Sequence, residues 1–150
     1  MSETRTATTE AQFLEDIFKN VKMGADSIVN LMNRVKDETL KLEMTYELDR
    51  YEEFARRVST LMTDRGLKPK EENPITKASA KIGMAMNTIT DSTTPHLAEM
   101  LIQGSVMGVT DLLKQISVAE ECGIDGDAMQ LAREAVDFEE DSTERLKKFL

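Results

Sequence analysis

The chain has 150 residues, ten methionines, no tryptophan and a formal net charge of −9 at pH 7. This charge repels phosphate backbones and anionic lipid headgroups, so we expect neither a nucleic-acid partner nor a membrane partner. No apolar run approaches the roughly 20 residues that span a bilayer, and the first residues lack the apolar stretch of a secretory signal. We therefore expect a cytoplasmic protein.

The first half of the chain predicts a helical hairpin. Residues 1–8 are small and polar and favour a flexible tail. Apolar side chains then recur at spacings of three and four, the period of one helix face, over about 10–36 and 38–65. Asp37 is placed to cap the second of these helices, and Gly66 to end it. Because almost no residues separate the two helices, we expect them to pack against each other.

The second half repeats this plan after a linker. Residues 66–73 carry glycine, proline and charge, and a shorter amphipathic helix is predicted over 74–90. Long helices over about 95–121 and 126–149 then form a second hairpin. No segment alternates as a strand does. We therefore predict an all-α fold with one domain over 9–150, an antiparallel four-helix bundle of two hairpins with an extra short helix in the crossover between them.

The two hairpins also resemble each other in sequence. Aligning the first helix of each hairpin brings Gly24 onto Gly108, and aligning the second helices brings Tyr51 onto Phe138. Helical periodicity alone gives some such agreement, but the matched glycines favour an internal duplication. In that case a pseudo-twofold axis relates the two hairpins.

Glycines interrupt the predicted helix 95–121 at Gly104 and Gly108. Glycine costs about 1 kcal/mol against alanine inside a helix, so something needs the missing side chain. Either a neighbour packs closely there, as we expect at Gly104, or a cavity lies beside it. Gly24 belongs to the same candidate set, as does Tyr51, a core residue whose hydroxyl needs a buried acceptor.

Two long hairpins joined by a crossover resemble the ferritin-like four-helix bundle. The segments MG, HLAEM and QGSVMG are similar to those of small bacterial ferritin-like proteins of unassigned function that lack the di-iron ligand set. This resemblance covers residues 10–150. Di-iron members carry a Glu on two helices and Glu-x-x-His on the other two. This chain has no Glu-x-x-His, and Gly24 and Gly108 hold the mid-helix positions. We therefore predict no di-iron centre and no cofactor.

The candidate metal ligands have plainer interpretations. Glu47, Glu134 and Glu139 border the inner stripes of their helices, where a solvated or salt-bridged flank is the favoured interpretation. Ligation of Fe or Mn is the alternative, because hard oxygen ligands can hold either ion without histidine. His96 can pair with Glu99 on the helix surface, and metal binding is again the alternative. No catalytic residue is predicted.

Three functions stay open. The leading one is a metal-free ferritin-like bundle that acts as a binding or structural module, forms a homo-oligomer and is not an enzyme. An alternative is an oxidoreductase or metal-storage protein with Fe or Mn held by carboxylates. A further alternative is a carrier of a small apolar ligand, bound in a cavity between Gly24 and Gly108.

Overall fold

The computed structural model describes residues 2–68 and 91–150, with side chains from residue 9 onward. The elements in these ranges are the helices α1 (Ser2–Met32), α2 (Glu38–Asp64), α4 (Thr94–Glu121) and α5 (Asp127–Leu146), and the short 3₁₀ helix η1 (Lys147–Phe149). This part of the chain contains no strand, which confirms the all-α prediction for it. The short helix predicted over 74–90 lies outside the described residues. None of the described helices is both long and apolar enough to cross a membrane.

The helix boundaries follow local sequence signals. Residues 2–8, predicted as a tail, belong to α1, because their small polar side chains include no glycine or proline that would break a helix. The side chain of Asp37 caps α2, accepting a hydrogen bond of 2.9 Å from the backbone N–H of Leu40. Gly66 follows the last turn of α2 with a φ of 73°, in the left-handed region that favours glycine. Both of these signals act as predicted.

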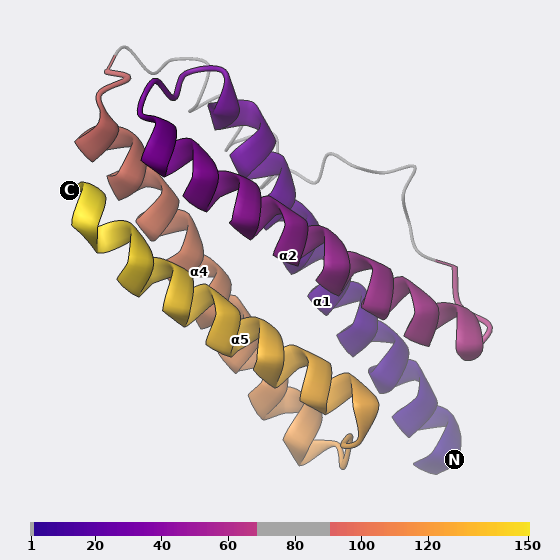
Figure 1. The fold of residues 1–150 in the computed structure, drawn as a ribbon. Helices are drawn as coiled ribbons and strands as arrows, with labels where there is room; N and C mark the ends of the chain where they lie inside the picture. Colours follow the sequence, from indigo (N-terminus) through magenta and orange to yellow (C-terminus); the bar gives the residue numbers. More distant parts are fainter. Residues whose placement is uncertain (1, 69–90) are drawn as a thin grey trace.

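The long helices lie side by side, α1 beside α2 and α4 beside α5 (Figure 1). Helix α1 also contacts α4, and α2 contacts α5. One apolar cluster fills the space between the four helices. Its fully buried large side chains include Leu14, Ile17 and Leu31 of α1, Met44 and Phe54 of α2, Leu97 and Leu112 of α4, and Leu131 and Leu146 of α5. Both halves of the chain therefore contribute to a single core.

The buried positions of the two halves correspond. Six of the seven buried residues of α2 are Leu40, Met44, Glu47, Tyr51, Phe54 and Val58. Six of the ten buried residues of α5 lie at the same intervals, namely Ala128, Ala132, Ala135, Glu139, Ser142 and Leu146. This register places Tyr51 opposite Glu139 and corrects the sequence alignment, which placed it opposite Phe138. The alignment matched the aromatic side chains, but the six matching buried positions set Tyr51 against Glu139, and Phe138 is buried beside it.

The ring of Phe138, on α5, packs against the aromatic rings of α2. Its ring centroid lies 5.0 Å from that of Tyr51, with the two planes at 84°, in an edge-to-face arrangement. The centroids of Phe54 and Tyr46 lie 5.7 Å and 6.5 Å away. This aromatic contact fixes α2 against α5 and holds Tyr51 in its position.

Candidate functional site

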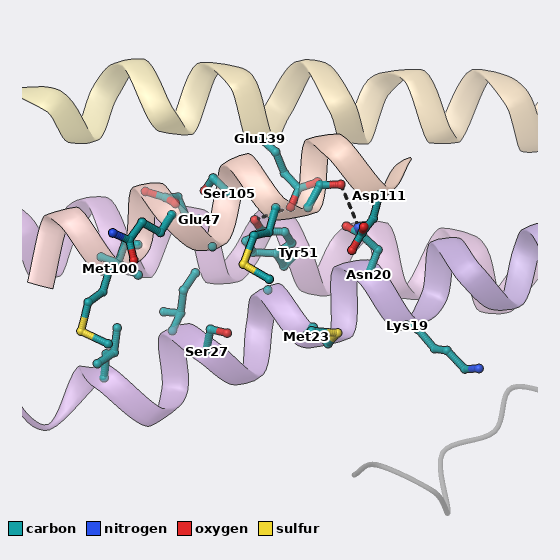
Figure 2. A pocket seen from close by; sticks show the side chains of 18 of the residues that line it. Lys19, Asn20, Met23, Ser27, Glu47, Tyr51, Met100, Ser105, Asp111 and Glu139 are labelled. Atoms are coloured by element: carbon teal, nitrogen blue, oxygen red, sulfur yellow. Dashed lines mark hydrogen bonds between the residues drawn. The ribbon is translucent and has the colours of Figure 1, made fainter. Parts of the chain in front are cut away.

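A pocket of about 340 Å³ lies between α1 and α4 (Figure 2). Glu47 and Tyr51 reach it from α2, and Glu139 reaches it from α5. Its apolar wall consists of Met23, Ile28, Leu31, Met100, Leu101 and Met107, together with Gly24, Gly104 and Gly108. Small-molecule sites typically measure about 300–1,000 Å³ and combine apolar walls with a few polar groups. The pocket has both properties.

Most of the wall comes from positions that correspond between α1 and α4. The pairs, in order along the helices, are Asp16 and Met100, Lys19 and Gln103, Asn20 and Gly104, Met23 and Met107, Gly24 and Gly108, Ser27 and Asp111, and Leu31 and Gln115. Both members of each pair line the same space. The pocket therefore lies where the two halves of the chain meet.

Two of the glycines make room for the polar side chains of the pocket. A Cβ atom at Gly24 would lie 2.4 Å from ring carbons of Tyr51, and one at Gly108 would lie 2.3 Å from Oε1 of Glu139. Real Cβ atoms essentially never approach their neighbours so closely, so a side chain at Gly24 would displace the Tyr51 ring and one at Gly108 would displace the Glu139 carboxyl. At Gly104, by contrast, a Cβ would meet no heavy atom within 4 Å. The expectation of close packing at Gly104 is therefore wrong, because this residue borders open pocket.

Tyr51 and Glu139 form a buried hydrogen bond at the inner side of the pocket. The Tyr51 hydroxyl donates to Oε1 of Glu139 at 2.9 Å, so it has the buried acceptor that its core position predicts. Burial raises the pKa of Glu139 to about 8; the donated hydrogen bond opposes this rise and the carboxylate of Asp111 adds to it. Burial and the nearby Glu139 also raise the pKa of Tyr51 above its ordinary value. Both groups are therefore neutral at pH 7.

Glu47 is a second buried carboxyl. Burial raises its pKa to about 9, Glu43 adds to the rise, and Arg145 and a hydrogen bond with Ser142 oppose it. Nε of Arg145 lies 3.1 Å from both carboxylate oxygens of Glu43, so the arginine is engaged there. Glu47 and Glu139 are each only 2% exposed. The flank interpretation is therefore wrong for both, because each side chain enters the space between the helices.

Four buried side-chain oxygens in the described part of the chain have no hydrogen-bond partner within the protein. They are Oδ1 of Asn20, Oε2 of Glu47, Oε1 of Gln115 and Oε2 of Glu139. All four belong to residues that line this pocket. A buried polar atom without a partner costs about 1–3 kcal/mol, so such atoms are normally few and scattered. Their concentration around one cavity marks it as the candidate binding site.

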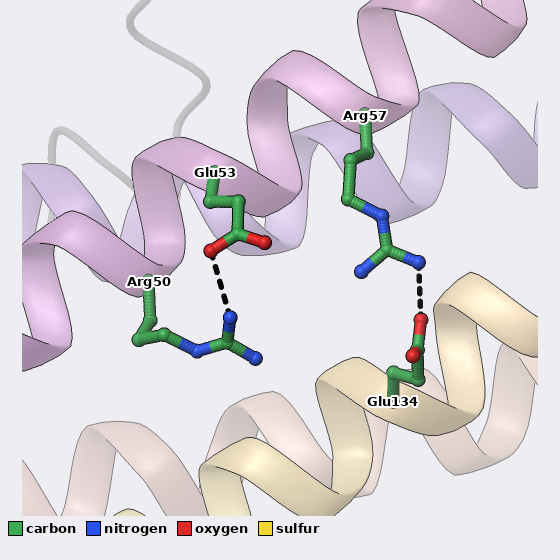
Figure 3. A network of polar contacts seen from close by, with 4 residues as sticks. All are labelled: Arg50, Glu53, Arg57 and Glu134. Atoms are coloured by element: carbon green, nitrogen blue, oxygen red, sulfur yellow. Dashed lines mark hydrogen bonds and ion pairs between the residues drawn. The ribbon is translucent and has the colours of Figure 1, made fainter.

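The remaining candidate residues lie elsewhere. Glu134 forms an ion pair with Arg57 of α2, and beside it Arg50 donates to Glu53 at 2.7 Å (Figure 3). Glu134 is therefore salt-bridged, as the favoured interpretation of its position predicts, and both partners are partly exposed. The three predicted carboxylates do not converge. In the described ranges no group of three or more His, Cys, Asp or Glu side chains is arranged to hold a metal ion.

The predicted surface pair at the start of α4 is present. Nδ1 of His96 lies 4.0 Å from Oε2 of Glu99, and both side chains are exposed. Neither residue lines the pocket. The pair therefore belongs to the helix surface and does not contribute to the candidate site.

Sequence reasoning missed Asn20 and Gln115. The Nδ2 atom of Asn20 donates to the backbone oxygen of Gly108 at 3.0 Å, which joins α1 to α4 and leaves Oδ1 free. One signal could have drawn attention to Asn20: in the predicted internal repeat it aligns with Gly104, so a polar side chain is set against an open position.

Comparisons with family models, curated proteins and solved structures return no match for this chain. The ferritin-like resemblance therefore stays a prediction, and the case for function depends on the pocket.

Proposed function

We propose that this protein is a ferritin-like bundle that binds a small, largely apolar molecule in the pocket between α1 and α4. In this proposal the four long helices are antiparallel, a pseudo-twofold axis relates the two hairpins, and no di-iron centre is present. The observation that carries the proposal is the placement of all four partnerless buried oxygens around one apolar cavity. A bound molecule would cover the methionine-rich wall, and a turn of these side chains toward it would give their oxygens hydrogen-bond donors.

The carboxylate-metal alternative has less support from the geometry. Glu134 is engaged by Arg57 outside the pocket, so only Glu47 and Glu139 of the predicted set enter the interior. Oxygen-bound divalent ions usually take about six ligands. Methionine, leucine and glycine wall most of the space beside the two carboxyls, which suits an apolar ligand better than a hydrated cation.

Binding can be tested by blocking the pocket at its open glycine. Gly104→Leu adds an apolar side chain to the pocket lining, and nothing lies within 4 Å of its Cβ. Calorimetric titration with n-octanol and n-octylamine should show at least a tenfold loss of affinity in this variant, with its helical circular dichroism unchanged. Ser117→Leu adds the same side chain at an exposed position of α4 and should bind as the wild type does. Equal binding by Gly104→Leu and the wild type would overturn the proposal.

The proposal includes self-association in the cytoplasm. Its support is a set of exposed apolar side chains on α4, namely Val106, Leu113 and Val118, which are 48–56% exposed. Cys122 is free and exposed, and cysteines of a reducing compartment usually stay unpaired. Light scattering coupled to gel filtration tests the assembly. A monomer of 16.9 kDa at high concentration would contradict self-association.

A further inference from the structure

The titratable side chains that line the pocket are mainly acidic, although burial keeps Glu47 and Glu139 protonated at pH 7. Four acidic residues face it, namely Asp16, Glu47, Asp111 and Glu139, whereas the basic residue in its lining is Lys19. Lys19 is exposed, and its side chain points away from the cluster around Tyr51 (Figure 2). A positively charged group that entered the pocket would therefore meet carboxyls and no competing cation at its inner side.

The hydrogen-bonding capacity of the pocket is equally one-sided. Its four partnerless atoms are all oxygens. Three of the nearby donors are already engaged: the Tyr51 hydroxyl donates to Glu139, Ser105 hydrogen-bonds to Tyr51, and the amide of Asn20 donates to a backbone oxygen. An ammonium group supplies three N–H donors and no acceptor. The carboxyls of Glu47 and Glu139 each carry an O–H donor while they are neutral, so the ammonium group complements this set once Glu139 has lost its proton.

We propose that the pocket takes a primary amine with an apolar chain, whose ammonium group donates to Oε2 of Glu139 while the chain lies against Met23, Met100 and Met107. This inference rests on the proposed function and names its ligand class. Two contacts position the carboxyl of Glu139 for this role. Tyr51 bonds to its other oxygen, and Gly108 leaves the space that its carboxyl occupies.

Binding of the amine is coupled to a proton. Burial raises the pKa of Glu139 to about 8, so its carboxyl is protonated at pH 7. A neighbouring ammonium group favours the carboxylate. As the cation binds, the O–H bond of Glu139 therefore breaks, the proton leaves to solvent, and the N–H group takes its place. The other titratable groups toward Glu139 are Tyr51 and Glu47 from α2, Asp111 from α4, and Asp16 and Lys19 from α1.

Calorimetry on the full chain with n-octylamine, n-octanol and octanoate tests the inference, because these probes share a chain and differ in the head group. We expect the amine to bind at least tenfold more tightly than the alcohol, and octanoate to bind most weakly. Titrations in two buffers of different ionisation enthalpy should show close to one proton released per amine at pH 7, and much less at pH 9.

Two carboxyl-to-amide variants of α5 provide the matched control. Glu139→Gln should lose at least tenfold in affinity for the amine and should release no proton, with octanol binding unchanged. Glu134→Gln, outside the pocket, should behave as the wild type. If the alcohol or octanoate binds as tightly as the amine, or if the two variants weaken amine binding equally, the head-group inference is overturned while pocket binding stands. If no probe binds, or if Gly104→Leu leaves binding intact, the proposed function itself is overturned.

Discussion

Tyr51 and Glu139 occupy corresponding positions in the two halves of the chain, 88 residues apart, and the hydroxyl of one donates to the carboxyl of the other. Each is accommodated by a glycine on the neighbouring helix, Tyr51 by Gly24 and Glu139 by Gly108. The two glycines correspond as well. The space beside each glycine is therefore filled by a different side chain, Tyr51 in one half and Glu139 in the other. These two side chains meet beside the pocket.

Alanine substitution at the three mid-helix glycines should change the free energy of unfolding in different directions. Gly104→Ala should stabilise the protein by up to about 1 kcal/mol, because alanine is the better helix former and the new Cβ meets nothing within 4 Å. Gly24→Ala and Gly108→Ala should each destabilise it by about 1–3 kcal/mol, because the added carbon overlaps Tyr51 or Glu139. Urea unfolding measures all three. A loss of stability in Gly104→Ala would show that the open space beside it is misassigned.

The stability of the protein should fall as the pH rises from about 5 to 8. The folded state keeps the carboxyls of Glu47 and Glu139 protonated up to pKa values of about 9 and about 8, whereas the unfolded chain loses these protons near the ordinary value of 4.5. The unfolded state therefore binds fewer protons in this window. The free energy of unfolding then decreases by up to about 1.4 kcal/mol per pH unit for each carboxyl. Urea titrations at several pH values measure the slope.

The substitution Glu139→Gln removes the contribution of Glu139 to this pH dependence. The amide keeps an acceptor for Tyr51 but does not titrate, so the variant should gain stability relative to the wild type as the pH rises from 5 to 8. Glu134→Gln, whose parent carboxylate is partly exposed and paired with Arg57, should show no such trend. Parallel pH profiles for Glu139→Gln and the wild type would mean that Glu139 is ionised in the folded protein.

The two tyrosines offer a direct comparison of a buried and an exposed hydroxyl. Tyr51→Phe should cost about 1 kcal/mol, because it removes the hydrogen bond to Glu139 and leaves both carboxyl oxygens of that residue without a partner. Tyr46→Phe should change stability by less than about 0.5 kcal/mol, since Tyr46 is 48% exposed and its ring keeps its place beside Arg145. Thermal unfolding of the two variants side by side decides the matter, and equal losses would contradict a special role for Tyr51.

Phe138→Ala should be among the most destabilising single substitutions, at about 3–5 kcal/mol, because it opens a cavity between α2 and α5. The side chain is 6% exposed and contacts three aromatic rings of α2. Phe138→Leu should lose less, since it refills part of the volume. Denaturant titration gives both values, and a loss below 1 kcal/mol for the alanine variant would show that these ring contacts contribute little.

The sequence predicted the helices and their caps because these depend on local signals, such as the period of the apolar residues, Asp37 and Gly66. It did not predict the site, because the site depends on contacts between distant segments. A glutamate at the edge of an apolar stripe is normally solvated, so nothing local distinguishes Glu139, which is buried, from Glu134, which is not. The difference is that a glycine of α4 leaves space opposite Glu139.

The unlike pairs around the pocket have a consequence for how a guest molecule would sit in it. In a cavity lined by two identical halves, a molecule turned end for end would find the same surroundings. Here Asn20 faces the space from one half and Gly104 from the other, Ser27 corresponds to Asp111, and Tyr51 to Glu139. The two ends of a bound molecule therefore meet different side chains. The pocket thus favours one orientation of the molecule over the reverse.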